Sequence, residues 1–262
     1  KSHLTGAVSS VSGKELQANV ARTTASALQG RVPGVTVSAN TGQPGSGMTI
    51  NIRGVSSLQS TTPLYVIDGV YGDINMVDPS DIQSIEVLKD ASAAAIYGSR
   101  AANGVVLITT KGGRKDMPTK VTVDAYTGIQ MVAKKYDVMD GDQYRDFAKI
   151  YNINQSVSEL TGWQGKGTDW QDELFRTAPV YNVNLSSSGG TEKIKYLISL
   201  NHFDQDGIMV GSGFNRTTLR TNVDAEVNPW FSLGTTVSLS REFSDISTLP
   251  SDYSLAVYGI GM

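Results

Sequence analysis

The first 113 residues combine short apolar runs with glycine-rich turns, a pattern that predicts a small α+β unit. Residues 23–32 are a predicted helix whose N-cap is Thr23 or Thr24. The Ala-rich segment 91–98 is a second predicted helix, with a close-packing surface rather than a binding motif. Five runs are predicted strands: 35–39, 48–54, 63–69, 84–90 and 104–113.

The second half alternates apolar and polar residues with a period of two. Five segments carry this pattern: 120–130, 180–190, 193–203, 218–227 and 231–243. In 193–203, for example, Ile194, Tyr196, Ile198 and Leu200 lie on one face, and Lys195, Ser199 and Asn201 on the other. Such strands are typical of a membrane β-barrel, whose apolar face contacts lipid. We expect these residues to point to lipid: Tyr196, Ile198, Leu219, Val223, Leu233 and Val237.

A soluble antiparallel sheet with one wet face would show the same alternation. The length of the segments favours the barrel, because soluble strands cluster at about 5–6 residues. The connections agree: 189–193 and 227–230 are short, whereas 131–179 and 207–215 are longer. The first long connection contains two predicted short helices, 141–152 and 168–176, each with an acidic residue near its N-terminus.

Composition narrows the functional classes. The net charge of −3 gives no electrostatic reason to expect nucleic acid, and the lack of cysteine excludes disulfides and thiolate metal sites. The sequence contains no run of 18 apolar residues, so it predicts no transmembrane helix. We find no enzyme motif and expect neither catalysis, a cofactor nor a metal site. His202 is expected to face the barrel lumen, and DQDG at 204–207 is read as a turn.

Three strings in the first half are individually distinctive: ALQGRVPGVTVSANTGQPGSGMTINIRG (27–54), TPLYVIDGV (62–70) and DIQSIEVLKDASAAAIYGSRAANGVVLITTKGG (81–113). In this order the chain resembles the SusC/RagA family of TonB-dependent outer-membrane transporters, and the likeness covers about 27–243. The resemblance implies an α+β plug domain followed by antiparallel transmembrane β-barrel strands, with the barrel incomplete. It divides the chain into an N-terminal linker (1–24), a plug (25–113) and the N-terminal part of the barrel (114–262).

The resemblance also implies how the plug is held. Arg53, in IRG, would form a buried ion pair with an acid on barrel strands beyond this chain, and Arg100 is a second candidate. A strand-capping surface charge is the alternative for Arg53. Asp68 and Gly69 are read as a turn, with a ligand role for Asp68 less favoured. We expect the TonB box and the remaining barrel strands to lie outside this chain, because an open edge in lipid is costly.

The function implied is energy-coupled import of a glycan or peptide across the outer membrane, with a SusD-like lipoprotein and TonB as partners. The alternative is a SusC-like barrel that serves as a structural scaffold; a siderophore receptor is a weaker third. Polar plug connections suit a hydrogen-bonding ligand, and Tyr71 offers an aromatic face. The expected substrate-binding residues are Gln59, Tyr71, Asp73 and Asn75; the turn 41–47 is read as solvated.

Overall fold

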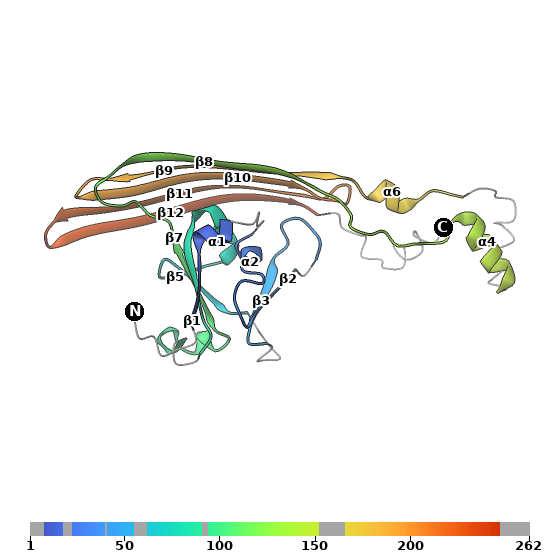
Figure 1. The fold of residues 1–262 in the computed structure, drawn as a ribbon, viewed down its shortest axis with the longest axis horizontal. Helices are drawn as coiled ribbons and strands as arrows, with labels where there is room; N and C mark the ends of the chain where they lie inside the picture. Colours follow the sequence, from blue (N-terminus) through green and yellow to red (C-terminus); the bar gives the residue numbers. More distant parts are fainter. Residues whose placement is uncertain are drawn as a thin grey trace.

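The computed structural model describes residues 8–17, 23–39, 41–54, 62–90, 94–151 and 166–246. They form two bodies. The first, which we call the plug, is the α+β unit that ends before residue 114. The second, which we call the wall, is a long curved sheet of strands β8 to β12. Figure 1 shows the plug against one face of the wall.

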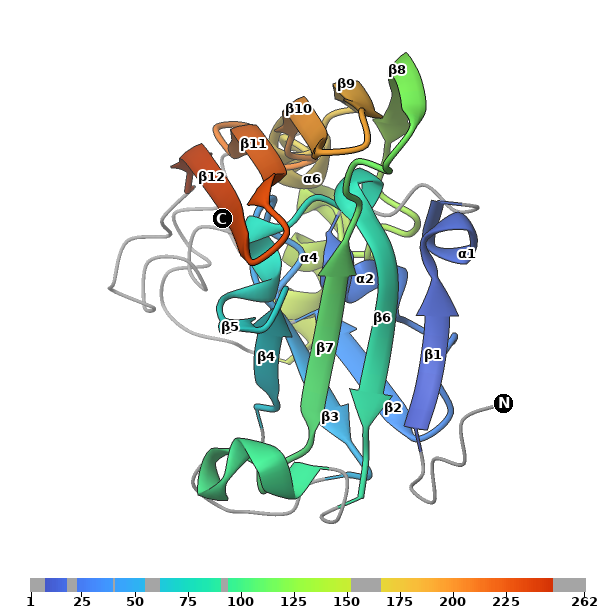
Figure 2. The same cartoon turned by 90° about the vertical axis from the view of Figure 1, so that its left-hand side faces the viewer.

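The plug contains a five-stranded sheet in the order β1-β6-β7-β4-β5. Its strands are β1 (Val8–Ser12), β4 (Leu64–Ile67), β5 (Val70–Tyr71), β6 (Ile82–Leu88) and β7 (Val105–Thr110). A separate hairpin pairs β2 (Val35–Ala39) with β3 (Met48–Ile52). Figure 2 shows that the long strands of the plug sheet stand with one end toward the wall. The predicted strands of the first half are therefore confirmed.

The plug helices are shorter than predicted. Thr23 caps α2 (Thr24–Ala27) through a capping box with Ser26, so the predicted start of this helix is right. The helix ends at Ala27, before the predicted end at residue 32. In place of a helix over 91–98, the described residues 94–101 form two 3₁₀ turns, η3 (Ala95–Tyr97) and η4 (Ser99–Ala101). Gly98, with φ of 71°, separates them, a conformation that a continuing helix cannot contain. Residues 91–93 lie outside the described part.

The buried apolar side chains of the plug form two clusters, and the larger one draws on β1, β2, β3, β6 and β7. Ile50, Ile82, Ile85, Val87 and Val106 are completely buried in it. Each such side chain contributes about 1.5–3 kcal/mol relative to exposure. The core also includes Val11 of β1 and Leu16 of α1 (Gly13–Gln17). Residues 8–17, which the sequence placed in a linker, are thus part of the plug sheet and its core.

The wall strands match the five predicted segments and extend them. They are β8 (Met117–Gln130), β9 (Ala178–Gly190), β10 (Ile194–Asp206), β11 (Gly213–Asn228) and β12 (Phe231–Asp245), all antiparallel neighbours. At about 3.4 Å a residue they run for roughly 45–55 Å. That length exceeds the apolar band of an outer-membrane barrel, which is about 25 Å tall.

The register places apolar and polar rows on opposite faces of the wall. One outer row contains Val123, Leu185, Leu200, Leu219 and Leu239, all exposed. The next inner row contains Asp124, Asn184, Asn201, Thr218 and Ser240, of which the three central residues are buried beneath the plug. A soluble sheet would bury its apolar face instead, so this arrangement excludes that alternative.

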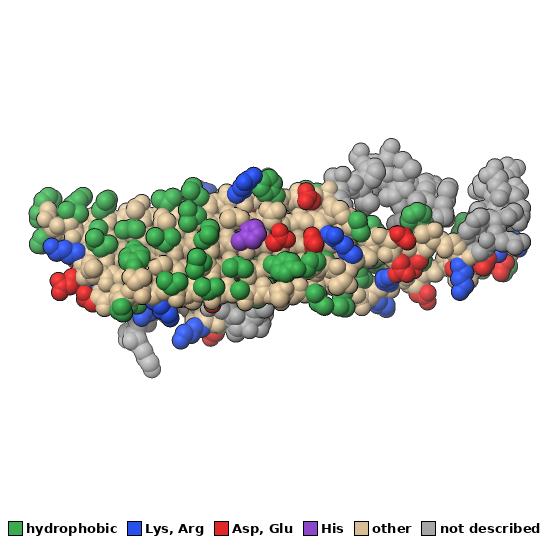
Figure 3. All heavy atoms as spheres, turned by 90° about the horizontal axis from the view of Figure 1, so that it is seen from above, with side chains coloured by type: hydrophobic (Ala, Val, Ile, Leu, Met, Phe, Trp, Pro, Cys, Tyr) green, Lys and Arg blue, Asp and Glu red, His purple; other side chains and the backbone are tan. Residues whose placement is uncertain are grey.

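His202 corrects one prediction. It lies on the exposed outer face in line with Ile198 and Leu200, and not on the lumen face. Its ring nitrogen Nδ1 lies 2.9 Å from the hydroxyl of Thr217 on the neighbouring strand. Figure 3 shows this outer face, where the histidine lies beside charged side chains and has hydrophobic ones on both sides. The next outer row contains the exposed Tyr181 and Phe243, so polar and apolar side chains are mixed in this part of the face.

The connections differ in length at the two ends of the wall. Residues 191–193 and 229–230 form short turns, whereas the connection after β8 carries α4 (Gly141–Ile150) and α6 (Trp170–Leu174). Asp142 lies in the first turn of α4 and Asp169 caps α6, so each helix has the acidic residue expected near its N-terminus; Asp140 caps α4. The connection between β10 and β11 has only six residues, shorter than expected, because both strands extend and Asp204 and Asp206 belong to β10. No helix among the described residues is long and apolar enough to cross a membrane.

Candidate site at the plug–wall interface

Three aspartates of the plug contact polar side chains on the inner face of the wall. They are Asp68, Asp78 and Asp81, and their partners are Arg220, Arg216 and Ser199. All six side chains are largely removed from solvent. A buried charge is costly unless it is paired, so these contacts determine how the plug sits on the wall.

Asp68 reaches the wall because it occupies a strained turn. It follows β4, and its φ of 50° with Gly69 at 86° turns the chain back into β5. Its carboxylate accepts hydrogen bonds from the backbone N–H (2.9 Å) and hydroxyl (2.7 Å) of Thr110. The Arg220 guanidinium donates to both Asp68 and the Thr110 hydroxyl. The predicted turn is confirmed, and the carboxylate also has a partner that the sequence did not indicate.

Asp78 forms the most buried ion pair of the described residues. Its carboxylate caps η2 (Pro79–Asp81) by accepting from Ser80 N–H, which leaves the second oxygen for Arg216 Nη2 at 3.0 Å. The exposed fractions of the two side chains are 3% for Arg216 and 2% for Asp78. Arg216 Nη1 also donates to the Asn75 carbonyl at 2.8 Å. One wall arginine therefore holds two consecutive turns of the plug.

Asp81 contacts the wall without a directly bound cation among the described residues. It accepts a hydrogen bond of 2.6 Å from the Ser199 hydroxyl, whose oxygen also accepts from the Asn184 amide. Burial raises the pKa of Asp81, and the neighbouring Asp78 charge raises it further. The Ser199 hydrogen bond and the charges of Arg220 and Lys111 oppose this rise only in part.

An apolar contact lies farther along the wall, toward the longer connections. Gly45, with φ of 72°, lies in the turn 41–47, and a Cβ added there would lie 2.1 Å from the Phe214 ring. Phe214 packs on the buried Phe203, with ring centroids 6.1 Å apart. Only glycine combines this backbone conformation with such close approach. Gly45 therefore contacts the wall, whereas Thr41, Gly42 and Gly47 of the same turn are exposed, as expected for a solvated turn.

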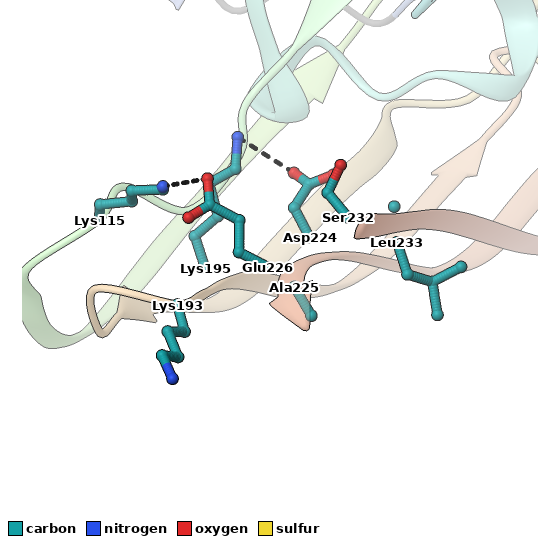
Figure 4. Close-up of a pocket in the computed structure, with 9 residues that line it drawn as sticks. Lys115, Lys193, Lys195, Asp224, Ala225, Glu226, Ser232 and Leu233 are labelled. Carbon is teal, nitrogen blue, oxygen red and sulfur yellow. Dashed lines mark hydrogen bonds and ion pairs between the residues drawn. The ribbon is translucent and has the colours of Figure 1, made fainter. Parts of the chain in front are cut away.

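Charged side chains surround a cavity at the short-turn end of the wall. It holds about 220 Å³, and Figure 4 shows the ion pairs that line it, Lys115 with Glu226 and Lys195 with Asp224. Lys193 points away from these pairs in the same view. A larger polar cavity of about 440 Å³ adjoins it between the plug and the wall and includes Asp68 and Thr110. Both cavities contact the segment that joins β7 to β8.

The two expected plug–barrel arginines lie elsewhere. Arg53 was expected to be buried against the barrel and to lack its partner in this chain. The second expectation is wrong, and the contact with further barrel strands stays a prediction. The Arg53 side chain is 53% exposed and pairs with Asp90 of the plug itself. Its φ of 59° turns the chain at the end of β3. Arg100 is also exposed, and its guanidinium lies 5.0 Å from the centre of the Tyr71 ring.

The structure describes three of the four expected substrate-binding residues, Tyr71, Asp73 and Asn75. Tyr71 is half-exposed and contacts Arg100, so the structure joins two residues that the sequence assigned to separate roles. The Asp73 carboxylate caps η1 (Ile74–Met76) and accepts from the backbone and side-chain amides of Asn75, each at 2.9 Å. Gln59 lies outside the described residues. The sequence analysis did not identify the residues that join the plug to the wall, Asp78, Asp81, Arg216 and Arg220. The only signal for them in the sequence was that they are charged. The described residues contain no group of three or more His, Cys, Asp or Glu that could hold a metal ion.

Comparisons with known proteins agree with this geometry. The family model of the TonB-dependent Receptor Plug Domain matches residues 1–105. TonB-dependent receptor P3 of Formosa agariphila is 42% identical over 247 residues, which cover 94% of this chain and 24% of that protein. TonB-dependent receptor SusC of Bacteroides thetaiotaomicron is 39% identical over 234 residues, which cover 85% of this chain and 23% of that protein. The chain thus spans about a quarter of the length of the curated relatives it matches.

Solved structures extend the likeness to the fold. The RagAB peptide importer in its closed-closed state is 32% identical, with a TM-score of 0.81 over 97% of this chain and 32% of that chain. The siderophore receptor PirA of Acinetobacter baumannii, at 20% identity and a TM-score of 0.60, shares the fold alone. The plug and wall are therefore an α+β plug and antiparallel barrel strands, and the chain belongs to the TonB-dependent receptors of the SusC/RagA type, β-barrel proteins of the bacterial outer membrane.

Proposed function

We propose that this chain is part of a transporter that imports a glycan or peptide nutrient across the outer membrane, driven by TonB. The observation that carries the proposal is the interface of plug and wall. The plug covers the polar inner face of β9 to β11 through hydrogen bonds and ion pairs rather than through an apolar core. Such an interface can separate without exposing a large apolar surface, as a plug that moves aside requires.

The proposal includes a SusD-like lipoprotein as partner, which the resemblance to the SusC/RagA family implies and the likeness to SusC and RagAB supports. RagAB is described as a peptide importer, which supports a peptide as one of the two substrate classes for this chain. We place the boundary of plug and barrel after residue 113, between β7 and β8. Arg53 and Arg100 make their described contacts within the plug, with Asp90 and Tyr71, and we propose that they also contact further barrel strands.

A growth experiment tests the proposal. The gene for the complete transporter is deleted, and growth is measured with single oligosaccharides or peptides as the limiting nutrient. We expect loss of growth on at least one of them, the same loss on deletion of the TonB gene, and recovery when the gene is restored. Unchanged growth on every nutrient, with altered outer-membrane assembly, would favour the structural scaffold. A TonB box in the sequence before Lys1 would favour transport.

We propose Tyr71 and Asp73 as substrate contacts at the polar loop after β5, with Gln59 and Asn75. Double replacement Tyr71→Ala/Asp73→Ala should weaken binding of the nutrient identified by growth. Asp73→Asn serves as a matched variant, because an amide oxygen can still cap η1. Unchanged affinity in the double variant, with normal barrel assembly, would move the site to other loops.

A further inference from the structure

We propose that Arg220 and the serines beside it form a binding position for a carboxylate or sulfate group of the transported solute. In the closed structure, aspartates of the plug occupy this position. The inference rests on the proposed transport function and specifies the chemical class of the solute. Four observations carry it: the origin of the partners of Arg220, its neighbours on the wall, its unused donor and the adjoining cavity.

The carboxylate that pairs with Arg220 belongs to the plug and not to the wall. Asp68 is 152 positions away in the sequence and joins Arg220 only because the plug rests on β11. Ser199, which faces Arg220 on β10, likewise donates to a plug carboxylate, that of Asp81. When the plug moves aside, Arg220 and Ser199 lose both carboxylates together.

The described residues of the wall place no replacement acid next to Arg220. The residues in its inner row, across the strands, are Thr122, Ser186, Ser199 and Ser238. The adjoining inner rows hold one carboxylate among the described residues, Asp124 on β8, three strands away. At about 4.8 Å between strands this is roughly 14 Å. Arg216 differs, because Glu242 lies directly opposite it on β12. Of the two wall arginines that pair with plug aspartates, Arg220 is therefore the one with no acid opposite it among the described residues.

Arg220 also has donor capacity that the plug does not use. Its side chain is 5% exposed, and Nη2 makes the contacts with Asp68 and Thr110. The Nε atom is buried and has no hydrogen-bond partner among the residues that the structure describes. A guanidinium binds carboxylates and sulfates best through two parallel N–H groups, and nearby hydroxyls supply further donors. A free anionic group can satisfy this arginine more fully than Asp68 does.

The polar cavity of about 440 Å³ connects this position with solvent. It is lined by Asp68 and Thr110, the two partners of Arg220, and by the cationic side chains of Lys111 and Arg114. Its charged wall residues, Lys195 and Asp224, pair with each other at 3.2 Å. Small anions can therefore approach Arg220 from the cavity once the Asp68 carboxylate is removed.

The test replaces the plug carboxylate with a free anion in the purified complete transporter. Asp68→Gly removes the carboxylate, and glycine accepts the φ of 50° at this position without strain. The thermal midpoint is measured with sodium acetate, sulfate or chloride at equal ionic strength. We expect acetate and sulfate to raise the midpoint of this variant at concentrations about tenfold or more below that of chloride. The wild type should show no such preference.

Arg220→Gln in the Asp68→Gly background should abolish the preference for acetate and sulfate. If the glycine variant does not fold, Asp68→Ser is a second variant that lacks the carboxylate beside Arg220. An equal response to all three anions, or a preference that persists without Arg220, would overturn the anion site. Because these measurements need neither a nutrient nor TonB, their failure is distinct from a failure of the growth experiment.

Discussion

The Asp78–Arg216 pair offers the sharpest test of how the plug is held. Replacement Asp78→Asn keeps the shape of the side chain and an oxygen that can cap η2, but it removes the charge opposite Arg216. The two side chains are only 2% and 3% exposed, so solvent screens the loss poorly. Removal of one partner from a buried pair costs about 3–5 kcal/mol, because an unpaired charge stays buried.

Hydrogen exchange in the complete transporter measures this cost. The backbone amides of residues 73–81 are protected while the plug rests on the wall, and they exchange when it opens locally. A loss of 3–5 kcal/mol corresponds to exchange that is faster by roughly two to three and a half orders of magnitude. The matched control is Lys195→Gln at the Lys195–Asp224 pair, whose side chains are 39% and 40% exposed. That change should cost less than about 1 kcal/mol.

A double variant separates charge from packing. In Asp78→Asn/Arg216→Gln no charge remains buried without a partner, so exchange should be slower than in Asp78→Asn alone. Exchange in Asp78→Asn that equals that of the wild type or of the Lys195 control would refute the reasoning. The plug would then be held by other contacts.

Three further predictions concern the turn, the outer face and the buried acid. Gly45→Val should detach the turn 41–47 from the wall, because its side chain would overlap the Phe214 ring. Hydrogen exchange in that turn should then be faster. Adding Phe214→Ala should relieve the overlap but not the backbone strain of valine at this positive φ. Leu219→Arg, on the outer leucine row, should cost about 2–4 kcal/mol in urea unfolding from lipid, whereas Leu219→Val should cost much less. A full-size effect of the valine change would contradict lipid exposure. Because burial raises the pKa of Asp81, its stabilising contribution is complete at low pH and is lost as pH rises through that raised pKa. Asp81→Asn should therefore have a higher thermal midpoint than the wild type at pH 7, and the difference should vanish near about pH 3. A difference that does not change with pH would show that ionisation of Asp81 is not its cause.

Local patterns allowed much of the fold to be predicted. The period of two assigned the apolar side chains of β8 to β12 to one face, because successive residues of a strand point to opposite sides. The cap Thr23 and the acidic residues Asp142 and Asp169 near helix N-termini were predictable because each acts within a few residues of its own position. Predictions failed where tertiary contacts override local preference. Small residues over 91–98 suggested a helix, but the described residues 94–101 follow two turns around Gly98.

The site depended on the tertiary structure. The sequence alone determined which positions carry charge and which strand face they share, since both follow from residue type and backbone period. It did not determine that Asp68, Asp78 and Asp81 meet Arg220, Arg216 and Ser199, across separations of 152, 138 and 118 residues. Any acid can pair with any arginine, so charge carries no information about which partners meet. The choice follows from where the plug turns place three carboxylates against the wall. For the same reason Arg53 pairs with Asp90 beside it in the plug, where the end of β3 brings the two together.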